Sequence, residues 1–322
     1  MKKILLLAFS LTTIFNFSFA LQGGPDAFGY IWKDSNEPGG PSYSWFDISV
    51  IGNPISGLGD DNVIGPKPLG GFFQFYWYQV DKCWIGSNGY LSFVNNGQLA
   101  SPFPTIPNSG GLNNYIAGMA SDLNFLGTPN SAQCFYYFNA DTFCLEYLNV
   151  PFWGTPNNTG NNSFEIILSK ADSSITINYM TQVGFTQSNS ISVGIENNTG
   201  LIGLMHSFNQ YPPSLYTVKY YYPQNPTLLV KDGSAEWSTT TANNGMFLKQ
   251  NGNAFNLVSD VKNQGNLIIA PCQVDGQILD LNNTVIVANT TFTDTLVPGQ
   301  DTVINFSNNY PTNTAGTFKF RT

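Results

Sequence analysis

The chain has 322 residues, a formal net charge of −8, 15% aromatic residues, only 10% charged residues and a single histidine. Apart from Lys2 and Lys3, its 12 Lys and Arg residues are scattered singly along the chain and form no basic stripe that could bind a phosphate backbone. This argues against nucleic-acid binding. A hydrophobic content of 42% is too high for a disordered chain. The length is enough for one large core or two ordinary ones.

The first 20 residues have the pattern of a cleaved signal peptide. Two lysines follow the initial methionine, residues 4–15 are apolar, and Ser18 and Ala20 put small residues at the −3 and −1 cleavage positions. We expect the mature chain to begin at Leu21. The apolar stretch is shorter than the roughly 20 residues of a membrane span, and no later stretch is apolar for that long. The sequence therefore predicts a secreted or cell-surface protein without a membrane span.

The next part of the chain reads as β-structure. Short runs rich in aromatic and β-branched residues are separated by Gly, Asn, Pro and Ser clusters, and no convincing 3.6-residue apolar period occurs in any window of about 12 residues. Ser87, Asn88 and Gly89 predict a hairpin turn, because Asn and Gly tolerate positive φ. We predict an all-β fold with antiparallel strands, clearest at 72–78, 84–85, 90–93, 164–168 and 175–179.

A change of composition follows residues 220–226. Aromatic residues become rarer, and apolar residues alternate with polar ones, as in the pairs Ile304 with Phe306 and Phe318 with Phe320. About 90 residues with this many strands is the size of one immunoglobulin-like sandwich. We predict two tandem antiparallel β-sandwich domains after the signal peptide, at residues 21–228 and 229–322.

An ordered series of short motifs carries a family resemblance. The motifs are GPDAFGY at 24–30, GLGDD at 57–61, IGSNGYLSF at 85–93, the segment 116–123, NVPF at 149–152 and the segment 193–200. Together they resemble the nidogen-like β-sandwich domain of large secreted and cell-surface proteins of the Bacteroidetes, over roughly residues 24–222.

The second segment resembles the adhesion-related bacterial immunoglobulin-like modules. Its motifs are VKNQGN at 261–266, LVPG at 296–299 and AGTF at 315–318. Both resemblances imply stalks, adhesion units or companions of catalytic domains in long exported chains. We expect the N-terminal part of such a longer chain, with an unusually short member of the group as the alternative.

The four cysteines are spread unevenly along the chain, at Cys83, Cys134, Cys144 and Cys272. Cys134 and Cys144 flank a hairpin-like stretch. If Ala140 and Asp141 form its turn, the two sulfur atoms point to opposite faces, and a disulfide needs a bulge or a change of register. The sequence leaves this bridge open. Cys272 is most simply a small buried apolar residue.

Residues for catalysis are few. His206, the only histidine, would have to serve any Ser-His-Asp or Cys-His mechanism, yet it lies in an apolar strand-like run and is best explained as a packed or edge-strand residue. Neither a Gly-x-Ser-x-Gly elbow nor a Cys-x-x-Cys pair occurs. Glu146, Glu165 and Glu196 are possible glycosidase carboxylates, but their strand and turn positions predict solvated, outward side chains. We therefore predict no enzymatic activity.

Two weaker site predictions remain. Asp60 and Asp61, in a glycine-containing loop, offer the oxygen ligands that calcium prefers, with Asp122 as a distant contributor, although Asp is also an ordinary turn residue. Calcium is the only cofactor for which the sequence offers a site. Tyr220, Tyr221 and Trp77 are candidates for stacking on sugar rings, although aromatic residues also fill wide sandwich cores.

The sequence as a whole predicts a non-enzymatic extracellular adhesion or scaffold protein, whose partner is an extracellular protein or a glycan surface. Two alternatives stay open. One is a carbohydrate-binding module, and the other is the accessory region of a secreted peptidase whose catalytic part lies elsewhere.

Overall fold

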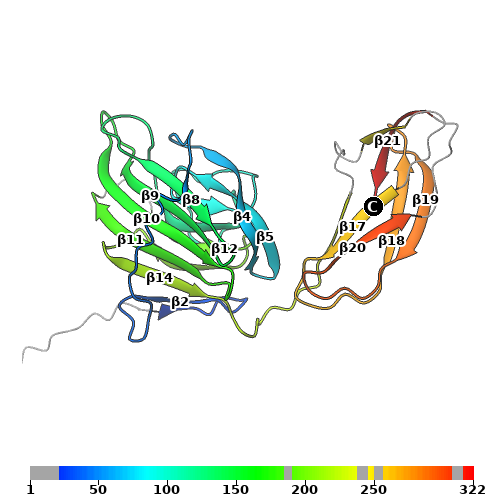
Figure 1. Cartoon of the computed structure of the whole chain (residues 1–322), viewed down its shortest axis with the longest axis horizontal. Helices are drawn as coiled ribbons and strands as arrows, with labels where there is room; N and C mark the ends of the chain where they lie inside the picture. Colours follow the sequence, from blue (N-terminus) through cyan, green and yellow to red (C-terminus); the bar gives the residue numbers. More distant parts are fainter. Residues whose placement is uncertain (1–21, 185–190, 238–245, 250–256, 307–314) are drawn as a thin grey trace, which may run out of the picture.

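The structure is a computed structural model that describes residues 22–184, 191–237, 246–249, 257–306 and 315–322. Within these ranges the chain forms antiparallel β-sheets and no helix, which confirms the predicted all-β, sandwich-like fold (Figure 1). The predicted signal peptide at residues 1–20, and Leu21, lie outside the described residues.

Two large sheets form the first sandwich. The eight-stranded sheet has, in spatial order, β1 (Gln22–Gly23), β2 (Ile31–Asp34), β14 (Tyr216–Tyr221), β11 (Ile175–Val183), β10 (Thr159–Ser169), β9 (Thr142–Phe152), β8 (Gln133–Phe138) and β3 (Asn53–Pro54). The six-stranded sheet has β13 (Gly203–Phe208), β12 (Ser192–Glu196), β7 (Tyr115–Ala120), β6 (Tyr90–Ser92), β5 (Tyr78–Gly86) and β4 (Val63–Phe75).

An aromatic core lies between these sheets. The hydroxyl of Tyr147 donates to the carbonyl of Gly86 at 2.8 Å, and the hydroxyl of Tyr179 donates to the carbonyl of Gly118 at 2.5 Å, so these two buried phenols of the larger sheet find partners on the smaller one. Gly118 also allows close approach of the two sheets, because a Cβ there would lie 2.8 Å from Cδ1 of Ile166. Many of the aromatic residues are therefore core residues.

A strandless segment, residues 42–52, covers part of the outer face of the eight-stranded sheet; we call it the strap. The backbone N–H of Phe46 donates to Glu165 at 3.1 Å, and that of Ile48 donates to Glu146 at 3.0 Å. Both carboxylates are fully buried. The prediction that Glu146 and Glu165 are solvated is wrong, because strand alternation points them away from the core correctly but does not show that the strap covers them.

The six-stranded sheet ends at β4, whose outer side pairs with no other strand in the described ranges. Pro66 and Pro68 lie in this strand and have no N–H to donate, and Lys67 between them carries a charge. The pairing of β4 with β5 is irregular at both prolines.

Two smaller sheets form a second sandwich. One contains β15 (Gly233–Trp237), β17 (Leu257–Asn263) and β20 (Asp301–Phe306), and the other contains β16 (Met246–Lys249), β21 (Gly316–Arg321), β18 (Gln273–Leu279) and β19 (Val285–Phe292). Its separate core includes Ile304, Phe306, Phe318 and Phe320, which confirms the faces predicted from two-residue alternation. The predicted division of the chain at residues 228 and 229, and the relation to immunoglobulin-like modules, stay predictions.

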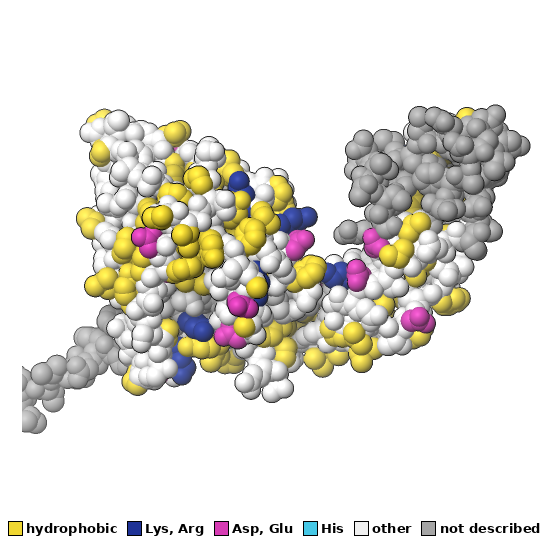
Figure 2. All heavy atoms as spheres, in the orientation of Figure 1, with side chains coloured by type: hydrophobic (Ala, Val, Ile, Leu, Met, Phe, Trp, Pro, Cys, Tyr) yellow, Lys and Arg dark blue, Asp and Glu magenta, His cyan; other side chains and the backbone are white. Residues whose placement is uncertain are grey.

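The hairpin of β8 and β9 leaves the cysteines unbridged. Phe138 pairs with Phe143, and the N–H of Asn139 donates to the carbonyl of Thr142, so Ala140 and Asp141 are the turn residues. Cys134 and Cys144 then lie on opposite faces of the sheet, and all four cysteines, Cys83 and half-buried Cys272 included, are free thiols. Most of the face shown in Figure 2 is uncharged, with a small number of Lys, Arg, Asp and Glu side chains spread over it.

Candidate functional site

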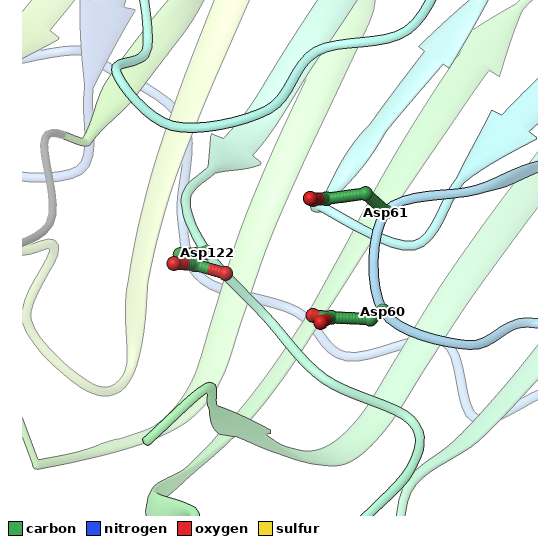
Figure 3. A group of neighbouring side chains, drawn as sticks. All are labelled: Asp60, Asp61 and Asp122. Atoms are coloured by element: carbon green, nitrogen blue, oxygen red, sulfur yellow. The ribbon is translucent and has the colours of Figure 1, made fainter. Parts of the chain in front are cut away.

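Three aspartates meet at one end of the first sandwich. Asp60 and Asp61 lie in the loop between β3 and β4, and Asp122 follows β7. One carboxylate oxygen from each lies within 4.8 Å of the other two. Figure 3 shows Asp60 and Asp61 leaving one loop and facing Asp122 on the opposite segment. The fold thus brings together the three residues that the sequence singled out for calcium.

The loop that carries Asp60 and Asp61 is held by its own polar side chains. Oδ1 of Asn62 accepts the N–H of Gly59 at 2.7 Å, and Nδ2 of Asn62 donates to the carbonyl of Gly57 at 2.7 Å. Such Asx-type bonds are the reason that Asn is common in tight loops. They fix the two aspartates relative to each other.

The hairpin turn after β5 ties this loop to Asp122. Ser87 donates through its hydroxyl to the carbonyl of Asp60, and Nδ2 of the buried Asn88 donates to Oδ1 of Asp61 at 2.7 Å. Oδ1 of Asn88 in turn accepts the N–H of Leu123, next to Asp122, at 3.0 Å. Asn88 therefore links both sides of the cluster. The turn predicted at Asn88 is confirmed, but no pattern in the sequence indicated that its side chain binds both Asp61 and the N–H of Leu123.

The electrostatics of the cluster are those of unbalanced negative charge. Burial, followed by the charges of Asp60 and Asp61, raises the pKa of Asp122 to about 6. Burial and the charge of Asp61 also raise the pKa of Asp60. Within the described residues no Lys or Arg forms a salt bridge with any of the three, and Oδ1 of Asp60 is buried without a hydrogen-bond partner. Such a set of oxygens suits a hard cation.

The predicted sugar-stacking residues do not form a platform. Tyr220 is fully buried and Trp77 is 7% exposed, so the prediction fails for these two rings. Tyr221, on the opposite face of β14, lines an open hollow of about 620 Å³ with Gln224, and its ring lies 5.3 Å from Nζ of Lys219. Successive side chains of a strand point to opposite faces of the sheet, so Tyr220 is buried in the core and its neighbour Tyr221 is not.

The third glutamate considered for catalysis, Glu196, is also fully buried rather than solvated. Its Oε2 accepts the N–H of Asn108 at 2.5 Å, so it fixes a loop that covers β12. Burial raises its pKa to about 7. The glutamates predicted to face solvent thus all bind backbone N–H groups of covering segments.

His206 lies on β13, an edge strand of the six-stranded sheet, as expected for a packed edge-strand residue. Its Nε2 is 3.0 Å from the hydroxyl of Tyr216, and its Nδ1 is 3.0 Å from the hydroxyl of Ser207. Tyr216 also contacts the buried Asp34, at 2.8 Å. Burial lowers the pKa of His206 to about 4 in spite of the nearby Asp34. No local pattern in the sequence predicted this group, because Asp34 lies 182 residues before Tyr216 in the chain.

Comparisons with known proteins agree with the fold. Residues 42–227, more than half of the chain, match the family described as NIDO related, that is, nidogen-related. No curated protein and no solved structure matched the chain. In the described ranges no helix has the length and apolar character to cross a membrane. The acidic cluster and His206 both lie within the matched residues, and the chain belongs to the nidogen-related family.

Proposed function

We propose that the protein is a non-enzymatic adhesion or scaffold protein of the cell exterior, which acts through surface contact. The observation that supports this proposal best is the nidogen-related sandwich itself, since such domains are typical of extracellular, non-catalytic proteins. The hydrogen bonds of the buried polar side chains also support a non-enzymatic role. Glu146, Glu165, Glu196 and His206 are buried or half-buried and bonded to neighbouring groups, an arrangement suited to stability more than to turnover.

Retention on a surface tests this proposal. Purified residues 21–322 should adhere to immobilised extracellular protein or glycan and should leave peptide and glycan substrates uncleaved. Turnover that disappears on His206→Gln or Glu165→Gln would show an enzyme instead. The accessory region of a secreted peptidase remains the alternative if the gene encodes a protease domain after Thr322, and the complete reading frame decides this.

The acidic cluster supports a second candidate function, calcium binding. Its three carboxylates come from two segments, so a cation bound between them would tie the loop that carries Asp60 to the end of β7. Burial, and after it the charges of Asp60 and Asp61, raise the pKa of Asp122, and a bound cation would offset that repulsion. In this proposal calcium is a structural ion that stabilises one end of the sandwich.

A calcium titration with calorimetry and thermal unfolding tests this candidate. We expect heat of binding and a higher unfolding temperature at pH 7.5, and both effects should disappear in Asp122→Asn. Both should weaken below a pH of about 6, because protons then compete for Asp122. Asp141→Asn, an exposed turn carboxylate on the β8–β9 hairpin, is the matched control and should behave as the parent protein. Equal calcium effects in both variants would exclude this site.

A further inference from the structure

A second hollow, distinct from the acidic cluster, opens beside His206. It has a volume of about 590 Å³, within the usual range of small-molecule sites, and its walls come from β2, β13, β14 and the loop between β13 and β14. We call it the histidine pocket and define it by six lining residues: Trp32, Asp34, His206, Gln210, Tyr211 and Tyr216.

The hydrogen bonds in this pocket run in one direction. The hydroxyl of Tyr216 donates to Oδ2 of Asp34 at 2.8 Å. Nε2 of His206 then donates to the oxygen of Tyr216, which leaves Nδ1 to accept from the hydroxyl of Ser207. This assignment makes His206 a neutral imidazole with a fixed tautomer, in agreement with the low pKa that burial gives it.

The charge of the pocket excludes anionic ligands. Its lining contains no Lys or Arg, and its one carboxylate, Asp34, already accepts the N–H groups of Asn36 and Glu37, at 2.8 and 3.1 Å, besides the Tyr216 hydroxyl. A phosphate or carboxylate would find no counter-charge here, and a cation would find a carboxylate already bonded. The surface offers neutral donors and acceptors, among them the exposed side chain of Gln210.

The aromatic side of the pocket is held in place before any ligand arrives. The Trp32 ring lies 4.5 Å from the imidazole of His206 and its Nε1 donates to the carbonyl of Met205 at 3.2 Å. The half-buried Tyr211 packs on Phe152 with ring centroids 5.8 Å apart, and its hydroxyl donates to Asn162. Binding of a ligand would therefore cost little side-chain conformational entropy.

Fixed aromatic rings next to neutral hydrogen-bonding groups match a ring with an apolar face and a rim of hydroxyl groups. We propose that the histidine pocket binds one neutral pyranose unit of a glycan, with Tyr211 against the sugar ring and the exposed side chain of Gln210 bonded to its hydroxyls. This inference rests on the proposed adhesion function, for which it names a ligand class, and it replaces the Tyr220, Tyr221 and Trp77 platform.

Saturation-transfer NMR with a panel of methyl pyranosides (glucoside, galactoside, mannoside and N-acetylglucosaminide) tests the proposal on residues 21–322. We expect transfer to at least one glycoside. Gln210→Ala should weaken its binding about 3- to 10-fold, as for one lost neutral hydrogen bond. Tyr211→Ala, which removes the half-buried ring placed against the sugar, should weaken it at least as much, and its thermal unfolding checks that the fold survives loss of the contacts with Phe152 and Asn162. Gln210→Ala is on the exposed rim and provides the decisive comparison if Tyr211→Ala unfolds.

The hollow beside Tyr221 supplies the matched controls. Gln224→Ala and Tyr221→Ala make the same chemical changes there and should leave glycoside binding unchanged. Loss of binding in these controls, with Gln210→Ala unaffected, would overturn the proposal, as would absence of transfer to every glycoside at about 10 mM. Continued adhesion to immobilised protein in that last case would show that the adhesion function stands and only the sugar proposal has failed.

Discussion

The buried carboxyl group of Glu165 is expected to make the free energy of unfolding depend on pH. Glu165 is fully buried, yet it accepts hydrogen bonds from Phe46 and from Asn178, at 3.1 and 2.7 Å. Burial nevertheless dominates and raises its pKa to about 7. A carboxyl group whose pKa is higher in the folded than in the unfolded chain stabilises the fold below its unfolded value, and that stability is lost as pH rises through the folded value.

Glu165→Gln should therefore flatten the dependence of stability on pH. The parent chain should lose free energy of unfolding between about pH 5 and pH 8, and the variant should lose less by on the order of 2–3 kcal/mol. Gln keeps the acceptor for the N–H of Phe46. Urea unfolding across this pH range measures the effect, with Asp141→Asn as the exposed control, and parallel profiles for the parent and Glu165→Gln would contradict it.

At the level of strands and turns, some features could be predicted from neighbouring residues in the sequence and others could not. Alternation predicted the buried faces of β20 and β21, and the Ser87–Gly89 motif predicted its hairpin turn. Alternation also gave the direction of Glu146, but only the position of the strap shows that this side is covered. The partner of Asp61, Asn88, and the partner of Tyr216, Asp34, are 27 and 182 residues away in the chain, so these environments could not be predicted from neighbouring residues.

The close approach of β7 to β10 makes a prediction at this scale. Gly118→Ala should destabilise the fold by about 1–3 kcal/mol, because the new Cβ would lie 2.8 Å from the side chain of Ile166. Chemical unfolding measures the loss. Gly97→Ala, where the nearest atom would be 3.8 Å away, is the control. Ile166→Ala removes both close atoms, Cδ1 and Cγ1, at 2.8 and 2.9 Å from the new Cβ. The double variant should therefore be destabilised by less than the sum of the two single variants, and additive losses would place the strain elsewhere.

Among the described residues, the two sandwiches of the molecule have cores that share no residue. The core of the first is rich in aromatic residues and draws on both large sheets, whereas the described core of the second is smaller and includes Val261, Ile278 and Phe320. A small core leaves less apolar burial to oppose chain entropy. The second sandwich is therefore expected to be the less stable of the two.

Calorimetry of residues 21–322 should show two unfolding transitions. Phe320→Ala should lower only the transition at lower temperature, by about 3–5 kcal/mol in free energy of unfolding, and Phe164→Ala should lower only the other by a similar amount. Both side chains are buried, one in each core. A single transition that both variants shift equally would mean that the two sandwiches unfold as one unit.

The two prolines of β4 hinder pairing of this edge strand with strands of neighbouring copies of the protein. An adhesion protein works at high local density, where an open sheet edge would recruit strands from neighbouring copies and start aggregation. Pro66 and Pro68 cannot donate to an incoming strand, and Lys67 places a charge between them. The longest strand of the six-stranded sheet thus protects the protein from polymerising with itself on the surface it is proposed to cover.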